Sequence, residues 1–262
     1  MINFFDVNFW IKNSSIDICE NSGIEKLNKI LIDNNISSAV ISNSLSLGYN
    51  WKTGNEELVN SKELIRNSSV FFSFLLVPEV YTLSNFRKYV SKCYSKKVRL
   101  FRFFPKSHLF CLSNYYMQGI LKVLNEYKFP IMIDFKQFDI TGNKYFDVNA
   151  LENILEKYKR LPFLLECSLK QLLFNRFFFP LLNKYKNLYI ETSSLLLMNQ
   201  VEEIVDKFGP ERIIFGTNYP ILDVEFSTGR ILLSDLDDSS KKDITFNNIT
   251  RILGNIEFNK DD

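Results

Sequence analysis

The chain of 262 residues has the length of one large domain, because α/β barrels of about 250 residues fold as single units. Apolar residues make up 46% of the sequence and charged residues 24%, which suits a globular protein with a sizeable core. The 32 basic and 30 acidic residues leave a net charge of +2. That balance argues against nucleic acid or an anionic membrane as the main partner.

The sequence carries no targeting or membrane signal. Its first ten residues, MINFFDVNFW, lack a basic segment followed by a long apolar one, so they do not form a signal peptide. No apolar run reaches the roughly 18 residues needed to cross a bilayer. The four cysteines lie far apart and form no C-x-x-C pair. We therefore expect a reduced, cytoplasmic protein without a membrane partner.

A single histidine, His108, limits the chemistry that this chain can support. Metal sites of the H-x-H type and zinc sites of the H-E-x-x-H type need more histidines than the sequence has. A Ser-His-Asp triad could use only His108, and no G-x-S-x-G motif supplies its serine. The histidine count therefore excludes the usual zinc hydrolase sites.

Short apolar runs alternate with amphipathic segments of helical length. The predicted strands are Ile2–Asn8, Ser38–Ser42, Ser69–Val77, Val98–Phe104, Pro130–Phe135, Pro162–Cys167, Asn187–Thr192 and Arg212–Thr217. The predicted helices are Ile24–Asp33, Glu56–Arg66, Leu83–Cys93, Ser113–Tyr127, Asp147–Tyr158, Leu169–Asn183, Leu196–Phe208 and a last one that starts after Asp237 and Asp238 and ends near Gly254. Thr82 or Ser84 is expected to cap the third helix, Ser113 the fourth and Asp147 the fifth.

Eight strands, each followed by a helix, predict a parallel sheet. The strands are continuously apolar and do not alternate, as expected where helices cover both faces of a sheet. Eight regular units in this length favour a single (β/α)8 TIM barrel over residues 1–262, with a doubly wound open sheet as the alternative. No linker, composition shift or internal repeat indicates a second domain.

Several segments, taken in chain order, resemble the amidohydrolase-related family of TIM-barrel hydrolases. The most specific is Phe208–Pro220, FGPERIIFGTNYP, which is similar to the family pattern F-G-x-x-R-x-x-F-G-S/T-D-x-P. The others are Phe5–Trp10 (D-x-H-x-H), Gly54–Glu57 (G-N-x-x), Val98–Pro105, Phe129–Asp134 (P-v-x-x-H), Asn187–Ser193 (N-v-y-x-D-x-S) and Asn248–Leu253 (N-x-x-R-L/I-L). The resemblance implies a hydrolase whose site lies at the C-terminal ends of the strands, the mouth of the barrel.

The residues at the family's metal-ligand positions differ almost throughout, because histidines and an aspartate are replaced by acids, amides and a tryptophan. They are Asn8 and Trp10 on the first strand, Asp134 on the fifth, Glu166 or Cys167 on the sixth and Asn218 on the eighth. The resemblance thus implies a degenerate metal site, in which Trp10 fills space that a metal normally occupies.

These replacements predict a cluster of oxygen-bearing side chains at the mouth, formed by Asp6, Asn8, Asp134, Glu166 and Asn218. Such oxygen ligands suit Mg²⁺, Mn²⁺ or Ca²⁺ better than Zn²⁺. Crowded carboxylates can instead divide into a general acid and a general base, because crowding separates their pKa values. In a further interpretation Asp6 caps a loop or meets an arginine and the cluster does not form. We expect a site without a cofactor; an oxygen-ligated divalent cation is the alternative.

Two basic side chains are further candidates at the mouth. Arg99 and Arg102 point to opposite sides of the fourth strand, so one of them can face into the barrel. Arg102, nearer the strand end, would then pair with Asp134 or bind a substrate carboxylate, unless it is a surface arginine. His108 either transfers protons at the mouth or is a loop histidine packed on Phe110 or bonded to the backbone.

Two functional hypotheses follow. In the first, the protein is a hydrolase with a degenerate metal site that acts on or binds a small carboxylate- or amide-bearing molecule. Its candidate catalytic residues are Asp134, Glu166 and His108, and its candidate substrate-binding residues are Asp6, Asn8, Trp10, Arg102 and Asn218. In the second, it is a catalytically inactive pseudo-hydrolase that serves as a ligand-binding or assembly protein, which Trp10 and Phe103 filling the mouth would favour. The resemblance also implies a homodimer, since many barrel proteins of this family dimerise.

Overall fold

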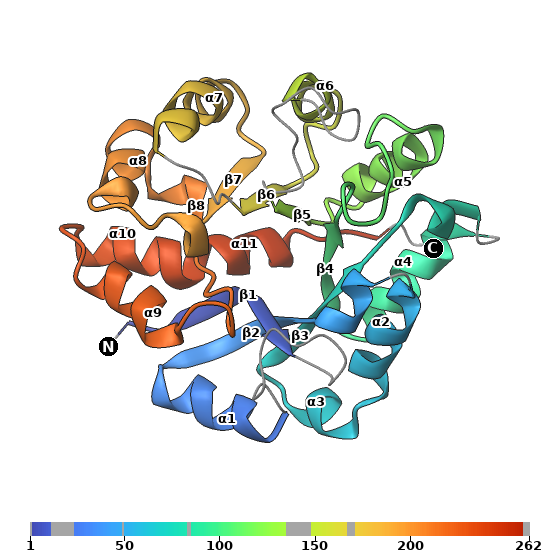
Figure 1. Ribbon diagram of the computed structural model, residues 1–262, viewed down its shortest axis with the longest axis horizontal. Coiled ribbons are helices and arrows are strands. Elements are labelled where there is room, and N and C mark those ends of the chain that lie inside the picture. Colours follow the sequence, from blue (N-terminus) through green and yellow to red (C-terminus); the bar gives the residue numbers. More distant parts are fainter. Residues whose placement is uncertain are drawn as a thin grey trace.

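The computed structural model describes residues 2–11, 24–48, 50–82, 85–134, 148–166 and 171–258. Eight parallel strands follow one another in chain order, each hydrogen-bonded to the next. Phe9 and Tyr219 form a parallel bridge that brings the chain after the last strand against the first and nearly closes the barrel (Figure 1). The strands are β1 (Phe4–Ile11), β2 (Ile36–Asn43), β3 (Val70–Leu75), β4 (Val98–Phe103), β5 (Ile131–Asp134), β6 (Phe163–Glu166), β7 (Leu188–Glu191) and β8 (Ile213–Ile214).

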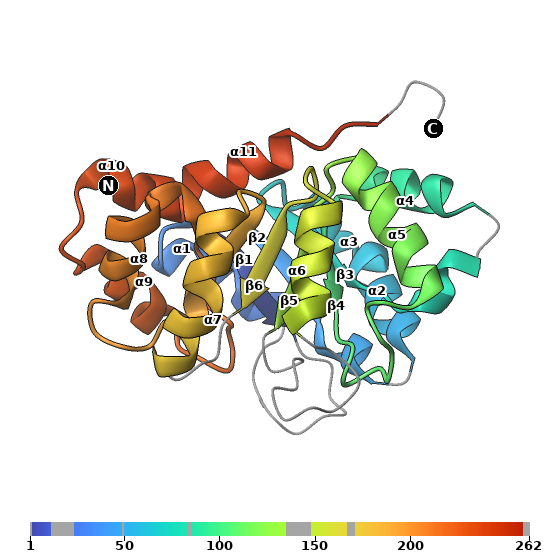
Figure 2. The same cartoon turned by 90° about the horizontal axis from the view of Figure 1, so that it is seen from above.

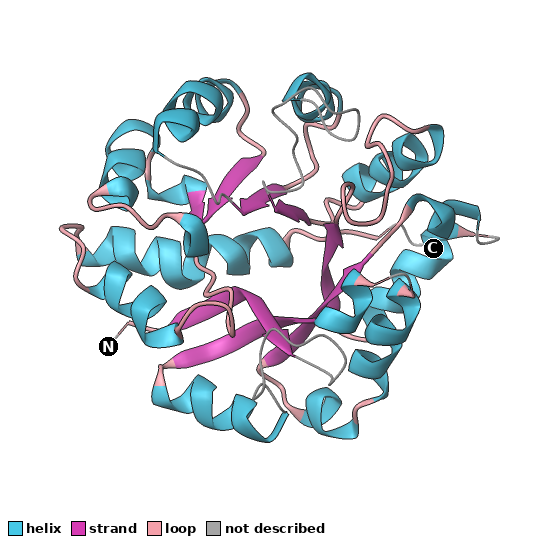
Figure 3. Ribbon diagram, in the orientation of Figure 1, coloured by secondary structure: helices cyan, strands magenta, loops and turns pink. Residues whose placement is uncertain are grey.

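Helices surround the strands on the outside, so the predicted (β/α)8 barrel is confirmed (Figure 3). They are α1 (Ile24–Asp33), α2 (Trp51–Asn60), α3 (Lys62–Arg66), α4 (Phe86–Ser95), α5 (Tyr115–Glu126), α6 (Val148–Lys157), α7 (Gln171–Lys184), α8 (Gln200–Phe208), α9 (Val224–Leu232), α10 (Asp238–Lys242) and α11 (Asn248–Gly254). Within the described ranges, none of these helices combines the length and the apolar character needed to cross a bilayer.

The ends of two strands differ from the prediction for a physical reason. β1 is longer than predicted because the N–H of Trp10 donates to the carbonyl of Tyr219, which continues the ladder. β8 is shorter because, beyond Ile214, the N–H groups of Gly216 and Thr217 donate to side chains rather than to a neighbouring strand. Hydrogen bonds to side chains thus take the place of hydrogen bonds between strands where the barrel closes.

The predicted helix caps are wrong for two helices. Asn85 caps α4 in place of Thr82 or Ser84, and Ser84 lies outside the described residues. Asn114 caps α5 in place of Ser113. Each asparagine immediately precedes the first helical residue and accepts a hydrogen bond from an N–H of the first turn.

Two helical regions also differ from the sequence-based prediction. The predicted helix Glu56–Arg66 is two helices, because Ser61 ends α2 and its hydroxyl accepts from the N–H of Leu64 to start α3. Helix α9 was not predicted. The predicted cap Asp147 lies outside the described residues.

The barrel interior is apolar where the strands begin. Inward-facing side chains from six strands pack there in one buried layer: Phe5, Val7, Val40, Leu100, Met132, Leu164 and Ile214. Ile249 and Ile252 of α11 pack onto this layer from the side where the strands begin. Helices α10 and α11 therefore run across this end of the barrel rather than along its outer wall (Figure 2).

The outward-facing strand residues form the main core against the helices. Phe101 of β4 stacks on Phe129 with ring centroids 4.5 Å apart. In α7, Phe178 is buried and Phe179 packs edge-on against Phe208 of α8, with centroids 5.0 Å apart. The many phenylalanines thus fill the space between barrel and helices, each burying a large apolar surface.

Three buried residues of the family-like motifs have a structural role, because their side chains hydrogen-bond the backbone of other elements. Arg212 donates to backbone carbonyls at the start of β7. Asn248 of α11 donates to two carbonyls beside β8. Asn55 of α2 donates to the carbonyl of Leu75 at 2.8 Å and accepts from its N–H at 3.0 Å, which ties α2 to the end of β3.

We predict that Asn55→Ala lowers the free energy of unfolding by about 2 to 4 kcal/mol, because it leaves the buried N–H and carbonyl of Leu75 without partners. Urea unfolding followed by circular dichroism measures the loss. Asn60→Ala, at the exposed end of the same helix, is the matched control. Equal losses in the two variants would contradict the role given to Asn55.

Candidate functional site

A polar layer lies next to the apolar one, towards the C-terminal ends of the strands. Side chains alternate along a strand, so the residue two positions beyond each inward-facing apolar residue also faces inward. In β1 a register shift between Asp6 and Phe9 turns Asn8 to the same side. Eight residues make up this polar layer, one per strand or just beyond it: Asn8, Ser42, Ser73, Arg102, Asp134, Glu166, Glu191 and Gly216.

Arg102 is the cation at the centre of the polar layer. One terminal nitrogen donates to Oδ1 of Asn8 at 2.7 Å and the other to Oε2 of Glu166 at 2.8 Å. Arg102 is only 1% exposed and Glu166 3%. Burial lowers the pKa of Arg102, while the charges of Glu166, Asp134 and Glu191 oppose that shift. The guanidinium is thus kept charged, out of water, by the acids around it.

Aromatic rings cover Arg102 on the side of the mouth. Its guanidinium carbon lies 4.4 Å from the ring centre of Trp10 and 5.5 Å from that of Phe104. The Trp10 ring nitrogen donates to Oδ1 of Asn8 at 3.0 Å, which fixes the indole over the cation. Phe104 packs with Trp10 and Leu75, whereas Phe103 faces the outer core. Phe104 therefore takes the place in the mouth that the sequence suggested for Phe103.

Three acids stand side by side on β5, β6 and β7. The strand register pairs Asp134 with Glu166 and Glu166 with Glu191. Their side chains therefore leave backbones that are about 4.8 Å apart, the spacing of neighbouring strands. Asp134 is half-buried, and the other two are buried. Arg102 donates a hydrogen bond to Glu166, the middle one of the three. Carboxyl groups this close together have different acidities, because the charge of one disfavours ionisation of the next.

Glu191, the acid on β7, has a strongly raised pKa. Burial, and secondarily the charge of Glu166, raise its pKa to about 8, against its hydrogen bonds from Ser193. Glu191 is therefore protonated near neutral pH. Its partner at 2.6 Å is the hydroxyl of Ser193, which can accept the proton's hydrogen bond as well as donate one. Sequence reasoning missed Glu191, although its inward position at the end of β7 matches those of Asp134 and Glu166.

Gly216 leaves the space that Glu191 occupies. A Cβ at this position would lie 2.2 Å from a carboxylate oxygen of Glu191 and 2.9 Å from Cβ of Asn8. Any side chain here would displace the acid or the first strand. The glycine of the F-G-S/T pattern thus has a steric role in the polar layer.

Asp6 turns away from the mouth and binds the chain beyond β8. Its carboxylate accepts from the hydroxyl of Thr217 at 2.5 Å and from the N–H groups of Thr217 and Asn8 at 3.0 and 2.8 Å. Burial raises the pKa of Asp6 to about 6, opposed by these hydrogen bonds. The structure places Asp6 in the loop-capping role that was one of its two interpretations.

Asn218 and His108 also take part in backbone contacts. Asn218 has φ +55°, a left-handed conformation that asparagine tolerates, and its carbonyl accepts from the N–H of Ile221. Nε2 of His108 lies 3.1 Å from the carbonyl of Ser46, so that nitrogen carries the proton. Burial lowers the pKa of His108, which keeps the ring neutral. Its ring packs edge-on near Phe104, not on Phe110.

The residues described at the mouth do not fit a divalent cation. Across the described part of the chain, no group of three His, Cys, Asp or Glu side chains is arranged to hold a metal. Oδ1 of Asn8 and Oε2 of Glu166 already accept hydrogen bonds from Arg102. A metal ion would have to compete for these oxygens against a guanidinium of the same sign of charge.

The sequence matches a family model for amidohydrolases over residues 95–254. A search of curated proteins found no match.

Solved structures with the same fold include enzymes that act on small acids. A 2,6-dihydroxybenzoate decarboxylase in complex with 2,6-dihydroxybenzoate has a TM-score of 0.76 at 10% identity, covering 97% of this chain and 99% of that one. A dihydroxybenzoic acid decarboxylase from Polaromonas with bound manganese has a TM-score of 0.72 at 10% identity, covering 98% and 100%. A candidate 2-pyrone-4,6-dicarboxylic acid hydrolase from Pseudomonas putida has a TM-score of 0.70 at 11% identity, covering 98% and 100%. Identities this low show a shared fold.

We predict that the raised pKa of Glu191 makes the protein less stable as the pH rises. In the folded state the pKa is about 8, against 4.5 without the fold, so the folded chain holds an extra proton between these values. This stabilisation is complete below about pH 4.5 and is lost as the pH approaches 8. Urea unfolding at a series of pH values should show wild type losing stability relative to Glu191→Gln, by at most about 1.4 kcal/mol per pH unit.

Asp6 titrates in both proteins, so its contribution cancels in that comparison. Glu257→Gln serves as the control, because the pKa of this exposed glutamate is lowered by its hydrogen bond with Lys128. It should leave the slope above pH 5 unchanged. Parallel curves for wild type and Glu191→Gln would mean that Glu191 is ionised in the folded protein.

Proposed function

This chain belongs to the amidohydrolase family, and we propose that it binds a small carboxylate- or amide-bearing molecule at the mouth of its barrel and acts on it without a catalytic metal. The observation that carries the proposal is the bonding of Arg102 to Asn8 and Glu166. These two residues stand where the family resemblance expects metal ligands. A fixed guanidinium thus supplies positive charge at the place of the cation.

The substrate class is supported by the charge of the site and by its structural neighbours. A guanidinium stacked under Trp10 attracts a carboxylate or the carbonyl oxygen of an amide. Trp10 and Phe104 offer aromatic surface beside that charge. The structurally similar 2,6-dihydroxybenzoate decarboxylase was solved in complex with 2,6-dihydroxybenzoate, a ring that carries a carboxylate. We therefore propose a small acid or amide with a ring or other flat apolar group.

The chemistry that this site can perform is proton transfer. Decarboxylation puts a proton on carbon, and amide hydrolysis needs a proton on the leaving nitrogen. Asp134 is the most open carboxyl of the three, so we assign it the contact with the reacting group. Glu191 holds a proton near pH 7, and we assign it the role of proton reserve within the polar layer. Glu166 holds Arg102 in place. We assign no step to His108, which is bonded to the backbone.

A binding protein without turnover is the second candidate. The packing of Trp10, Leu75 and Phe104 over Arg102 favours it, because these rings restrict access to the charged layer. Such a pseudo-hydrolase would bind its ligand above the rings. Binding assays combined with product analysis separate the two candidates.

We predict that the purified protein contains far less than one equivalent of metal and that MnCl₂ does not shift its thermal unfolding. Arg102→Ala should cost roughly 3 to 5 kcal/mol, because it removes the cation of a buried ion pair and leaves the charge of Glu166 in the interior, and added Mn²⁺ should restore part of the loss. Elemental analysis and thermal melts measure both effects.

Arg99→Ala is the matched control on the same strand, since its guanidinium donates to the backbone carbonyls of Tyr94 and Val98 and lies over the ring of Tyr94, away from the polar layer. It should gain nothing from Mn²⁺. A stoichiometric metal in the wild-type protein would refute a metal-independent site whatever the variants do.

We predict that 2,6-dihydroxybenzoate and its amide quench the fluorescence of Trp10 in a Trp51→Phe variant, which leaves Trp10 as its one tryptophan. Resorcinol, which lacks the carboxylate or amide, should bind at least about tenfold more weakly. If the site is catalytic, chromatography will detect product, and Asp134→Asn will slow its formation by about 100-fold or more while binding persists. Binding without product would establish the second candidate. Equal binding of resorcinol would disprove the proposed ligand class.

A further inference from the structure

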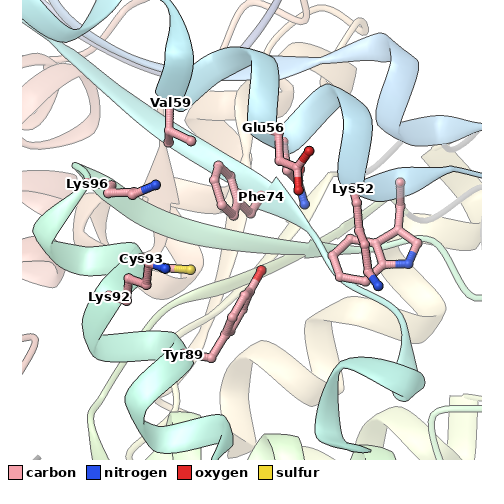
Figure 4. Close-up of a pocket in the computed structure, with 10 residues that line it drawn as sticks. Lys52, Glu56, Val59, Phe74, Tyr89, Lys92, Cys93 and Lys96 are labelled. Atoms are coloured by element: carbon pink, nitrogen blue, oxygen red, sulfur yellow. The ribbon is translucent and has the colours of Figure 1, made fainter. Parts of the chain in front are cut away.

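A second hollow lies on the outer wall of the barrel, away from the mouth. It opens between α2 and α4, and Phe74 of β3 forms its floor (Figure 4). Its volume is about 240 Å³. Phe74 faces outward, whereas its neighbour Leu75 faces into the barrel and packs with Trp10. The two sites are therefore separated by the wall of β3.

The inner surface of this outer pocket is apolar and aromatic. Trp51, Phe74 and Cys93 line it with exposed fractions of only 4%, 6% and 4%. Val59 faces Phe74 from α2 (Figure 4). The indole nitrogen of Trp51 donates to Glu79 at 3.1 Å, which holds the ring in place. A flat apolar group can therefore stack in this pocket.

The polar atoms inside the pocket carry no charge. The hydroxyl of Tyr89 and the thiol of Cys93 both belong to the lining of the pocket. Burial raises the pKa of Cys93 to about 12, and burial also raises the pKa of Tyr89. Both groups thus remain protonated at neutral pH, and they do not repel an anion.

The rim of the pocket is positively charged. Lys52, Lys92 and Lys96 surround the opening, against one acid, Glu56 (Figure 4). Among the described residues, none of the three ammonium groups has an ion pair or a hydrogen bond to another side chain. Lys52 lies over the ring of Trp51, with its nitrogen 5.5 Å from the ring centre. The rim can therefore neutralise a negative group on a bound molecule.

We propose that this pocket between α2 and α4 binds a small aromatic carboxylate, with its ring against Trp51 and Phe74 and its carboxylate at Lys92 and Lys96. The volume lies below the usual range of ligand pockets, which limits the ligand to about one ring. The assignment does not depend on the proposed function, because the pocket shares no side chain with the polar layer.

Benzoate is the probe, and Trp51 is the reporter. In a Trp10→Phe variant Trp51 is the one remaining tryptophan, so its fluorescence reports on the outer pocket. Benzoate should change its emission saturably, with a Kd of roughly 1 mM. Benzamide, which has the ring but no charge, should bind about tenfold more weakly, and acetate, which has no ring, should cause no change.

Variants of the rim and the floor locate the binding. Lys92→Gln and Lys96→Gln should each weaken benzoate about threefold, as expected for exposed charge pairs. Lys88→Gln, on the exposed face of the same helix, is the matched control and should have no effect. Val59→Phe fills the hollow and should abolish the response.

If Trp10→Phe does not fold, titration calorimetry measures benzoate binding to the same lysine variants in chains that retain both tryptophans. Loss of heat with the double variant Lys92→Gln/Lys96→Gln, and not with Lys88→Gln, supports the site. The proposal is overturned if benzoate leaves Trp51 unchanged, if benzamide binds as well as benzoate, or if Lys88→Gln weakens binding as much as the rim variants. Binding at the mouth is measured separately through Trp10, so the two proposals fail independently.

Discussion

Arg102 and Glu166 carry opposite charges, lie 2.8 Å apart and are almost completely removed from water. Removing two ions from water costs more than their mutual attraction returns unless further hydrogen bonds satisfy them. The surrounding residues supply these bonds and charges: Asn8 accepts from the second guanidinium nitrogen, and Trp10 lies against its face. The geometry of the mouth therefore depends on this pair, since losing either partner would leave a buried charge.

The neighbour of this pair on β7, Glu191, holds a proton. Glu191 lies next to Glu166 on the adjacent strand and is completely buried, so burial first and the charge of Glu166 second keep a proton on it. A divalent cation in the same position would carry twice the charge and would favour ionised ligands. In the metal-free site that we propose, Glu191 is therefore a proton carrier and not a metal ligand. This is the physical reason for proposing proton transfer.

The two faces of β3 contribute to two different sites, the mouth of the barrel and the outer pocket. Leu75 faces inward beneath the mouth, and Phe74 faces outward into the hollow between α2 and α4. Asn55 connects them, because it lines the hollow and holds the backbone of Leu75 through two hydrogen bonds. Strand alternation thus lets one short segment contribute to a charged interior site and to an aromatic pocket with a cationic rim.

The sequence alone determined the barrel and its eight strands, because periodicity and strand ends are local properties. It also predicted that Arg102 or Arg99 faces inward. Only the tertiary structure decided the partners: Asp6 bonds to Thr217, more than two hundred residues away, and Arg102 bonds directly to Glu166. Strand register and the tilt of a barrel set these pairings, and no local pattern encodes them. Glu191 was missed for that reason, since its acidity depends on strands that only folding brings together.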